Sequence, residues 1–278
     1  MSERLSLNNE ELRTLVLDVL KVNDSSQFNS FYNRIALEAK DKGLLKEENV
    51  SSLYSSAPYL ENYDRVRVQN ILWDLIIEGI IRPGLGDGMN ESFPFFHVTE
   101  KGEEILKKDS VTPYDPDSYL KIINKEVPNV DNVIIKYLDE SLNTFRIGCL
   151  LSSTISLSCA SEKTFMILIE SFINAIENGE TKKKFAKLIE GRTIKRQFDE
   201  FVKYYNSSFK SKLNGDLRDG FETTVLGIFG IIRANRNDSG HPTGKEVDRE
   251  QLYANIIIFR TYLKKIYSLV DWLQDNKI

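Results

Sequence analysis

The segment from Arg233 to Gly244, RANRNDSGHPTG, concentrates the side chains best suited to acid-base chemistry in this chain. Within it, Arg236 precedes His241 by five residues. Histidine can take up or release a proton near neutral pH, and the guanidinium group of arginine matches the geometry of phosphate oxygens. A histidine acting on a 2′-hydroxyl and an arginine stabilising the charged phosphate are the minimum set for cleaving RNA without a metal. DNA lacks this hydroxyl, so the pattern favours RNA as the substrate.

Histidine and cysteine are scarce, with two of each among the 278 residues. A structural zinc site with four nitrogen or sulfur ligands would need all of them, and they lie far apart, so we expect no metal and no cofactor. Cys149 and Cys159 form no CxxC pair, which indicates a reducing, cytoplasmic compartment. His97 lies in an aromatic stretch with no acid-base partner nearby in sequence. His241 is therefore the candidate, and a dimer would supply a second copy of it.

Charge is distributed unevenly along the chain. Residues 1–117 carry 13 basic and 21 acidic side chains, a net charge of −8, whereas residues 118–278 carry 24 basic and 20 acidic, a net charge of +4. The stretch Lys182–Arg218 alone has a net charge of +7. It contains Lys195 and Arg196, which either guide RNA toward the reactive segment or belong to an ordinary solvated helix face.

Short helices followed by strands are predicted for the first part of the chain. Apolar residues at helical spacing predict helices over 8–22, 27–42, 47–55 and 63–81. A short aromatic strand over 93–98 and a helix with Thr99 as its N-cap follow. The segment from Leu75 to Leu106, LIIEGIIRPG to PFFHVTEKGEEIL, resembles the hairpin end of a winged helix-turn-helix domain, and the resemblance covers about residues 8–108.

Residues 109–117, DSVTPYDPD, hold two of the seven prolines and predict a linker between the domain 1–108 and the domain 118–278. Beyond the linker the pattern predicts an α-helical bundle, with helices over 118–125, 129–142, 144–178, 181–190, 192–208, 215–234 and 247–275. The segment 235–244 reads as a loop. The longest apolar stretches, 147–160 and 223–232, are shorter than the roughly 20 residues of a membrane span, so we expect no membrane partner.

The spacing Arg236-x4-His241, with Asn237 directly after the arginine, resembles the signature of the HEPN superfamily. The position late in a helical domain matches that family too, and the resemblance covers about residues 118–275. Glu162, in ASEKT at the centre of a long predicted helix, fits the same group less specifically. The resemblance implies a helical domain that dimerises, so that two motifs face each other across one composite cleft. It also implies metal-independent endoribonuclease activity, although some members are inactive binding modules.

Carried over to this chain, the resemblance makes Arg236 and His241 the catalytic pair. The supporting or substrate-binding positions are then Arg233, Asn237, Asp238, Glu162, Lys195 and Arg196. The same residues also fit a capped helix end, because arginine favours a helix C-terminus and Gly240 and Pro242 punctuate the exit.

Three functions remain open from the sequence. The first is a homodimeric ribonuclease that cuts tRNA or mRNA in bacterial defence or toxin action, with the winged-helix domain binding a protein partner or inhibitor. The second is a transcriptional regulator that reads DNA through Arg65 and Arg67 and dimerises through an inactive helical domain; the net charge of −8 weighs against it. The third is a non-catalytic interaction module.

Overall fold

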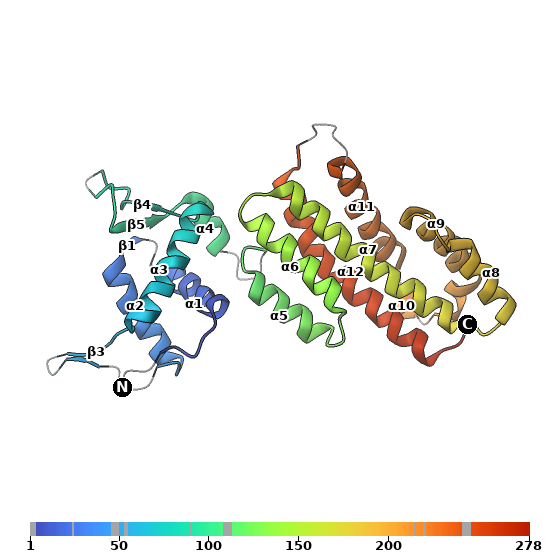
Figure 1. Cartoon of the computed structure of the whole chain (residues 1–278), viewed down its shortest axis with the longest axis horizontal. Helices are drawn as coiled ribbons and strands as arrows, with labels where there is room; N and C mark the ends of the chain where they lie inside the picture. The colour runs from blue at the N-terminus through green and yellow to red at the C-terminus, as the bar shows by residue number, and fades with distance from the viewer. Residues whose placement is uncertain are drawn as a thin grey trace. The chain divides into compact units, whose positions relative to one another are not determined.

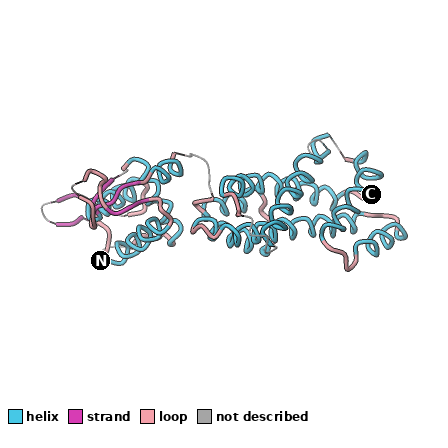
Figure 2. Tube along the Cα trace, turned by 90° about the horizontal axis from the view of Figure 1, so that it is seen from above, coloured by secondary structure: helices cyan, strands magenta, loops and turns pink. Residues whose placement is uncertain are grey.

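The structure is a computed structural model that describes residues 4–23, 25–45, 50–52, 55–88, 90–107, 113–213, 215–218, 221–240 and 246–278. The chain divides into two compact units (Figure 1). The first comprises Met1–Tyr119 with Arg146–Gly148, and the second comprises Leu120–Phe145 with Cys149–Ile278. Among the described residues, strands occur in the first unit and the second unit is helical (Figure 2). The prediction of a mainly α fold with a small β component is therefore confirmed.

The first unit contains, in chain order, α1 (Asn9–Val22), β1 (Ser25–Gln27), α2 (Phe28–Asp41), β2 (Val50–Ser52), β3 (Ser55–Pro58), α3 (Asn62–Ile77), β4 (Ile81–Pro83), β5 (Phe95–Val98) and α4 (Glu100–Leu106). Three strands form an antiparallel sheet in the order β1-β5-β4. Phe96 pairs with Ser26 on one side and with Pro83 on the other. Strands β2 and β3 form a separate antiparallel pair.

Local sequence explains where several of these elements begin. Helix α1 starts with a capping box, in which Asn8 and Glu11 satisfy each other's main-chain N–H groups. Thr99 caps α4 as predicted, because its hydroxyl accepts a hydrogen bond from the Gly102 N–H at 3.0 Å. Strand β5 alternates, with Phe96 buried and His97 half-buried. A β-hairpin with a polar tip therefore joins α3 to α4.

Two predictions for this unit are wrong. The helix over 47–55 is wrong: the described residues of that segment belong to β2 and β3, because serine has little preference for a helix interior and the pairing of the two strands decides the structure. The helix predicted over 63–81 ends at Ile77. Gly79, at a φ of +71°, turns the chain out of the helix, and β4 follows.

The second unit contains α5 (Pro116–Glu126), α6 (Asn132–Arg146), α7 (Leu150–Ala175), α8 (Gly179–Ile189), α9 (Ile194–Tyr204), the π-helical turn η1 (Tyr205–Phe209), the 3₁₀ turn η2 (Lys210–Lys212), α10 (Gly215–Arg218), the π-helical turn η3 (Phe221–Leu226), α11 (Gly227–Gly240) and α12 (Arg249–Asp275). Helices α7 and α12 run side by side through the middle of this unit, and α11 packs against α7 (Figure 1). Residues 109–112 of the predicted linker lie outside the described residues, and α5 begins at Pro116 within the predicted stretch.

Three helix predictions for the second unit need correction. The helix predicted over 144–178 is interrupted, because Gly148 adopts a φ of +87°, so that α7 starts only at Leu150. The helix predicted over 192–208 ends at Tyr204 and continues as the π-helical η1. The helix predicted over 215–234 consists of α10, η3 and α11, and α11 runs on to Gly240.

Aromatic side chains fill much of the core of the second unit. Phe165, Phe172 and Phe201 are fully buried and make tilted or edge-to-face ring contacts, with centroids 5.1 Å apart for Phe172 and Phe201. Tyr205 and Phe209 are also buried, so these two rings belong to the core rather than to a surface that could stack bases. Close packing of this kind fixes the positions of α7, α9 and α11 relative to one another.

Candidate active site

Helix α11 carries four of the predicted site residues: Arg233, Arg236, Asn237 and Asp238. The loop predicted from residue 235 is wrong, because the main chain stays helical through Gly240. Asparagine, aspartate, serine and glycine favour turns by local preference, but packing of α11 against α7 supports the helix beyond that preference. His241 lies outside the described residues, as do the side chains of residues 234–240.

The buried side of α11 fixes the helix before the motif begins. Phe229 is 1% exposed and stacks on Phe198 of α9, with centroids 4.6 Å apart, and its ring lies 5.0 Å from Phe165 of α7. The buried hydroxyl of Ser158 donates a hydrogen bond to the carbonyl of Ile232 at 3.2 Å. These contacts hold the turn that leads directly into Arg233, which is half-buried.

Helical spacing groups part of the motif on one side of α11. Positions 233, 236, 237 and 240 follow the i, i+3, i+4, i+7 pattern and therefore share one face. Position 238 falls on a different face, so the structure separates Asp238 from the stripe that begins at Arg233. Arg233, Arg236 and Asn237 are thus the predicted residues that the helix brings together.

Glu162 lies on α7, away from Arg236 within one chain. Ser158 is level with Ile232 and Phe165 is level with Phe229, so α7 and α11 run antiparallel. These two contacts separate Glu162 from the level of Arg236 by four to eight residues, or about 6–12 Å along the helix axes at the usual rise of about 1.5 Å per residue. Glu162 is half-buried and lies near Tyr262 of α12. The structure therefore does not bring Glu162 to the motif within one protomer.

Lys195 and Arg196 are exposed on the first turn of α9. The stacked pair of Phe198 and Phe229 holds this turn against the middle of α11. Arg233 lies one helical turn after Phe229, so the first turn of α9 and the motif are near each other. The arrangement places three cationic side chains around the contact between α9 and α11.

Buried hydroxyl groups stiffen the helices behind the motif. Tyr262 is fully buried and donates a hydrogen bond to the carbonyl of Ser161 at 3.1 Å. Burial raises the pKa of Tyr262, so its hydroxyl stays protonated and keeps this bond. Small side chains such as Ser158 and Ser161 also let α7 approach α11 and α12 closely. The frequent serines of α7 therefore serve packing.

An exposed apolar stripe on α7 is a surface that the sequence did not reveal. Leu151, Ile155 and Met166 lie on one side of α7 and are 51%, 36% and 52% exposed. Because α7 and α11 are antiparallel, Ile155 is level with the turn between Arg233 and Arg236. Ile231 of α11 is also exposed, at 45%. The sequence places these three residues four and eleven positions apart, which is helical spacing. Because α7 contains many other apolar residues, however, the sequence does not distinguish this exposed side from the buried side.

The described part of the chain contains no group of three or more His, Cys, Asp or Glu residues that could hold a metal ion. No helix within the described residues is long and apolar enough to cross a membrane. No protein-family profile, curated protein or solved structure matches this chain. A proposal about function therefore depends on the residues and geometry of α7, α9 and α11.

Proposed function

We propose that this protein is a metal-independent endoribonuclease of the HEPN type, active as a homodimer. Arg236 and His241 are the catalytic pair, and the N-terminal unit is a winged-helix domain. The helical second unit supports the proposal, as does the position of the motif at the end of α11 and directly before the long helix α12.

The strongest support for the proposed homodimer is the exposed stripe of Leu151, Ile155 and Met166. Exposed apolar side chains grouped on one helix face typically mark a surface that a partner covers. A second copy related by a two-fold axis would bury this stripe against its own counterpart. Because Ile155 is level with the turn from Arg233 to Arg236, the same axis would bring the ends of both α11 helices together.

The chemistry follows from the residue types in such a dimer. One His241 accepts the proton of the 2′-hydroxyl as it attacks the adjacent phosphorus, and the His241 of the second copy donates a proton to the leaving 5′-oxygen. The products are a 2′,3′-cyclic phosphate and a 5′-hydroxyl. Arg236 stabilises the negative charge that develops on the phosphate oxygens. Arg233 and Asn237 share a helix face with Arg236 and bind the neighbouring phosphate or ribose.

Lys195 and Arg196 support an approach path for the substrate. Both are exposed on the turn of α9 that packs against α11. Cations near the site attract a polyanion and raise its association rate, particularly at low salt. tRNA and mRNA are the substrate classes that we propose.

The order of elements in the first unit supports a winged-helix domain: α1, β1, α2 and α3 precede a hairpin of β4 and β5, and the sheet order is β1-β5-β4. The separate pair β2-β3 is inserted between α2 and α3. Helix α3 gives little support to a role of this domain in DNA binding. Arg67 pairs with the buried Asp64 at 2.9 Å, and Arg65 bonds Asn29 and lies over the ring of Tyr32. Both arginines are therefore engaged within the unit.

The exposed side of α3 favours a protein partner for this unit. Val66, Trp73 and Ile77 are 48%, 43% and 73% exposed, and they follow one another at helical spacing. Base edges and phosphates call for hydrogen-bond donors and cations at such positions, whereas a protein surface accepts apolar side chains. We propose that an inhibitor or activator binds here rather than DNA.

The dimer proposal is tested by charging the stripe. Ile155→Asp places a carboxylate in the proposed interface and should convert dimers to monomers in analytical ultracentrifugation. RNA cleavage in the presence of EDTA should fall with it. Leu188→Asp is the matched control, because Leu188 is 43% exposed on α8, away from the stripe. If Ile155→Asp stays dimeric and cuts RNA as well as Leu188→Asp, this interface is wrong.

A further inference from the structure

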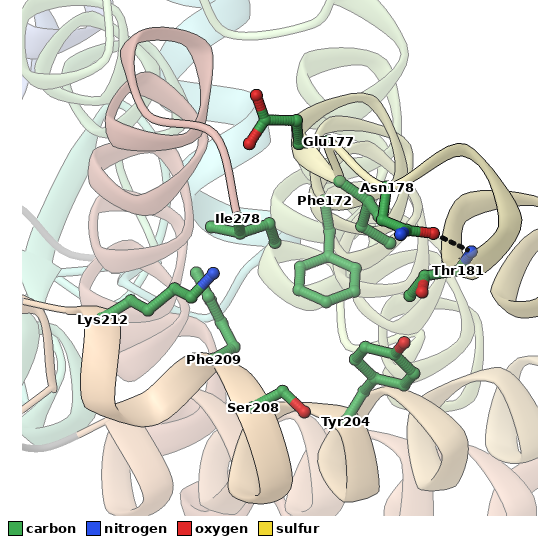
Figure 3. A pocket seen from close by; sticks show the side chains of 10 residues that line it. Phe172, Glu177, Asn178, Thr181, Tyr204, Ser208, Phe209, Lys212 and Ile278 are labelled. Carbon is green, nitrogen blue, oxygen red and sulfur yellow. Dashed lines mark hydrogen bonds between the residues drawn. The ribbon is translucent and has the colours of Figure 1, made fainter.

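A cavity of about 400 Å³ opens at the end of the second unit remote from the motif. It lies between the end of α7, the start of α8 and the turns η1 and η2, and Ile278 covers one side (Figure 3). Phe172, which lines it, is 14 to 18 residues along α7 from the level of Arg236, or about 21–27 Å at the usual rise of about 1.5 Å per residue. The cavity is therefore distinct from the proposed catalytic site.

The floor of this cavity is apolar and held rigidly. Phe172 and Phe209 are buried, with ring centroids 5.3 Å apart. Phe172 also contacts Phe185 and Tyr204 edge-on, at 5.2 and 6.0 Å. Because each ring is fixed by several others, the floor resists collapse, and the cavity volume lies within the roughly 300–1,000 Å³ of small-molecule sites. Tyr204 is half-buried, so part of its ring is open to a ligand.

The rim of the cavity is polar, and Lys212 places an ammonium group on it. Figure 3 shows the ammonium group of Lys212 and the hydroxyls of Ser208 and Tyr204 around one space, while the carboxylate of Glu177 turns away from it. Within the described ranges, no carboxylate forms an ion pair with Lys212. Asn178 and Thr181 at the start of α8 also line the cavity, and the Asn178 side chain accepts a hydrogen bond from the Thr181 N–H at 2.9 Å.

We propose that this cavity binds a nucleoside monophosphate group. The base would lie against the half-buried Tyr204 ring, because every base presents a flat π-face that stacks on aromatic side chains. The phosphate would bind Lys212, since an ammonium group attracts phosphate oxygens. The hydroxyls of Ser208 and Thr181 lie where they can bond the ribose. The proposal does not depend on ribonuclease activity.

Such a group has two sources, a free mononucleotide or the end of an RNA strand. Calorimetric titration of the full chain with AMP, adenosine, inorganic phosphate and a 5′-phosphorylated RNA hexamer separates them. AMP should bind at least tenfold more tightly than adenosine or phosphate alone, because each probe lacks one of the two contacts. Tighter binding of the hexamer than of AMP identifies the strand end, and weaker binding identifies the free nucleotide.

The variants Lys212→Met and Lys203→Met test the assigned cation. Lys203 is an exposed lysine of α9 that pairs with Glu200 at 2.8 Å and does not line the cavity, so its variant is matched for charge. Lys212→Met should weaken AMP binding about tenfold or more, as expected when a hydrogen bond to a charged group is lost. Lys203→Met should bind AMP like the wild type. Undetectable AMP and hexamer binding at millimolar concentration, or equal AMP affinity in the two variants, would overturn the proposal.

Discussion

The stacked rings of Phe198 and Phe229 provide a quantitative test of how α9 is held against α11. Their centroids are 4.6 Å apart with an interplanar angle of 24°. Phe→Ala changes in a core typically cost about 3–5 kcal/mol, and leucine keeps much of the apolar volume, so each single Phe→Leu variant should lose about 1–2 kcal/mol of unfolding free energy. An aromatic pair adds about 0.5–1.5 kcal/mol beyond its buried area. The double variant should therefore lose less than the sum of the singles by that amount.

The two tryptophans of the chain make this measurement specific to the second unit. Trp73 lies in α3 and Trp272 lies in α12, where its ring is 5.8 Å from that of Phe209. A Trp73→Phe background leaves Trp272 as the fluorescent reporter of the second unit during urea unfolding. This choice matters because a chain with two units need not unfold in one step.

A second cycle, combining Phe198→Leu with Phe259→Leu, is the control for the coupling. Among the described residues, Phe259 makes a ring contact with Tyr262 at 5.9 Å and none with Phe198. Without direct contact, the two changes should add within about 0.5 kcal/mol. Equal coupling energies in the two cycles would show that the Phe198–Phe229 stack does not hold the first turn of α9 near Arg233, and the proposed approach path would then lose its support.

Three further substitutions test the packing and electrostatics of the two units. Gly102→Ala should destabilise the first unit by at least about 1–3 kcal/mol, because its new Cβ would meet the Ile80 carbonyl and lie 2.7 Å from Val98. Gly230→Ala in α11 should stabilise the second unit by up to about 1 kcal/mol, because its new Cβ meets nothing within 4 Å. Differential scanning calorimetry checks both, and an equal effect of the two changes would contradict the packing at Gly102. The hydrogen bond from Arg260 lowers the pKa of Glu126 to about 2. This stabilisation is present above about pH 4.5, is lost as pH falls toward 2, and amounts to about 1 kcal/mol after allowing for solvent screening. Urea unfolding of wild type and Glu126→Gln should therefore differ at pH 6 and converge near pH 2; a difference that does not change with pH would refute it.

Elements fixed by local chemistry were predictable from the sequence. The N-cap at Thr99, the alternation of β5 and the apolar face of α1 each depend on neighbouring residues, and the structure contains all three. The strands β2 and β3 were missed because pairing between short serine-rich segments is decided by tertiary contacts rather than by residue preference.

The surroundings of the motif were predictable only in part. Residue type and spacing identify Arg233 and Arg236 in the sequence, but the same sequence predicts a loop over Asn235 to Gly240, because those residues favour turns locally, and the structure has a helix there. The hydrogen bond from Ser158 to Ile232 fixes the register between α7 and α11 and so separates Glu162 from Arg236. Local sequence patterns cannot predict this contact, because the two residues are 74 positions apart. The exposed stripe at Ile155 was hidden for the same reason, since only the packed structure shows which side of α7 stays open.

The central claim is tested most directly by cleavage of one labelled RNA in the presence of EDTA. Wild type should produce fragments ending in a cyclic phosphate, and the Arg236→Ala/His241→Ala double variant, checked for unchanged thermal stability, should produce none above background. If the double variant cuts the RNA as fast as wild type, the site at the end of α11 is wrong. If neither protein cuts tRNA or mRNA, the ribonuclease assignment itself is contradicted.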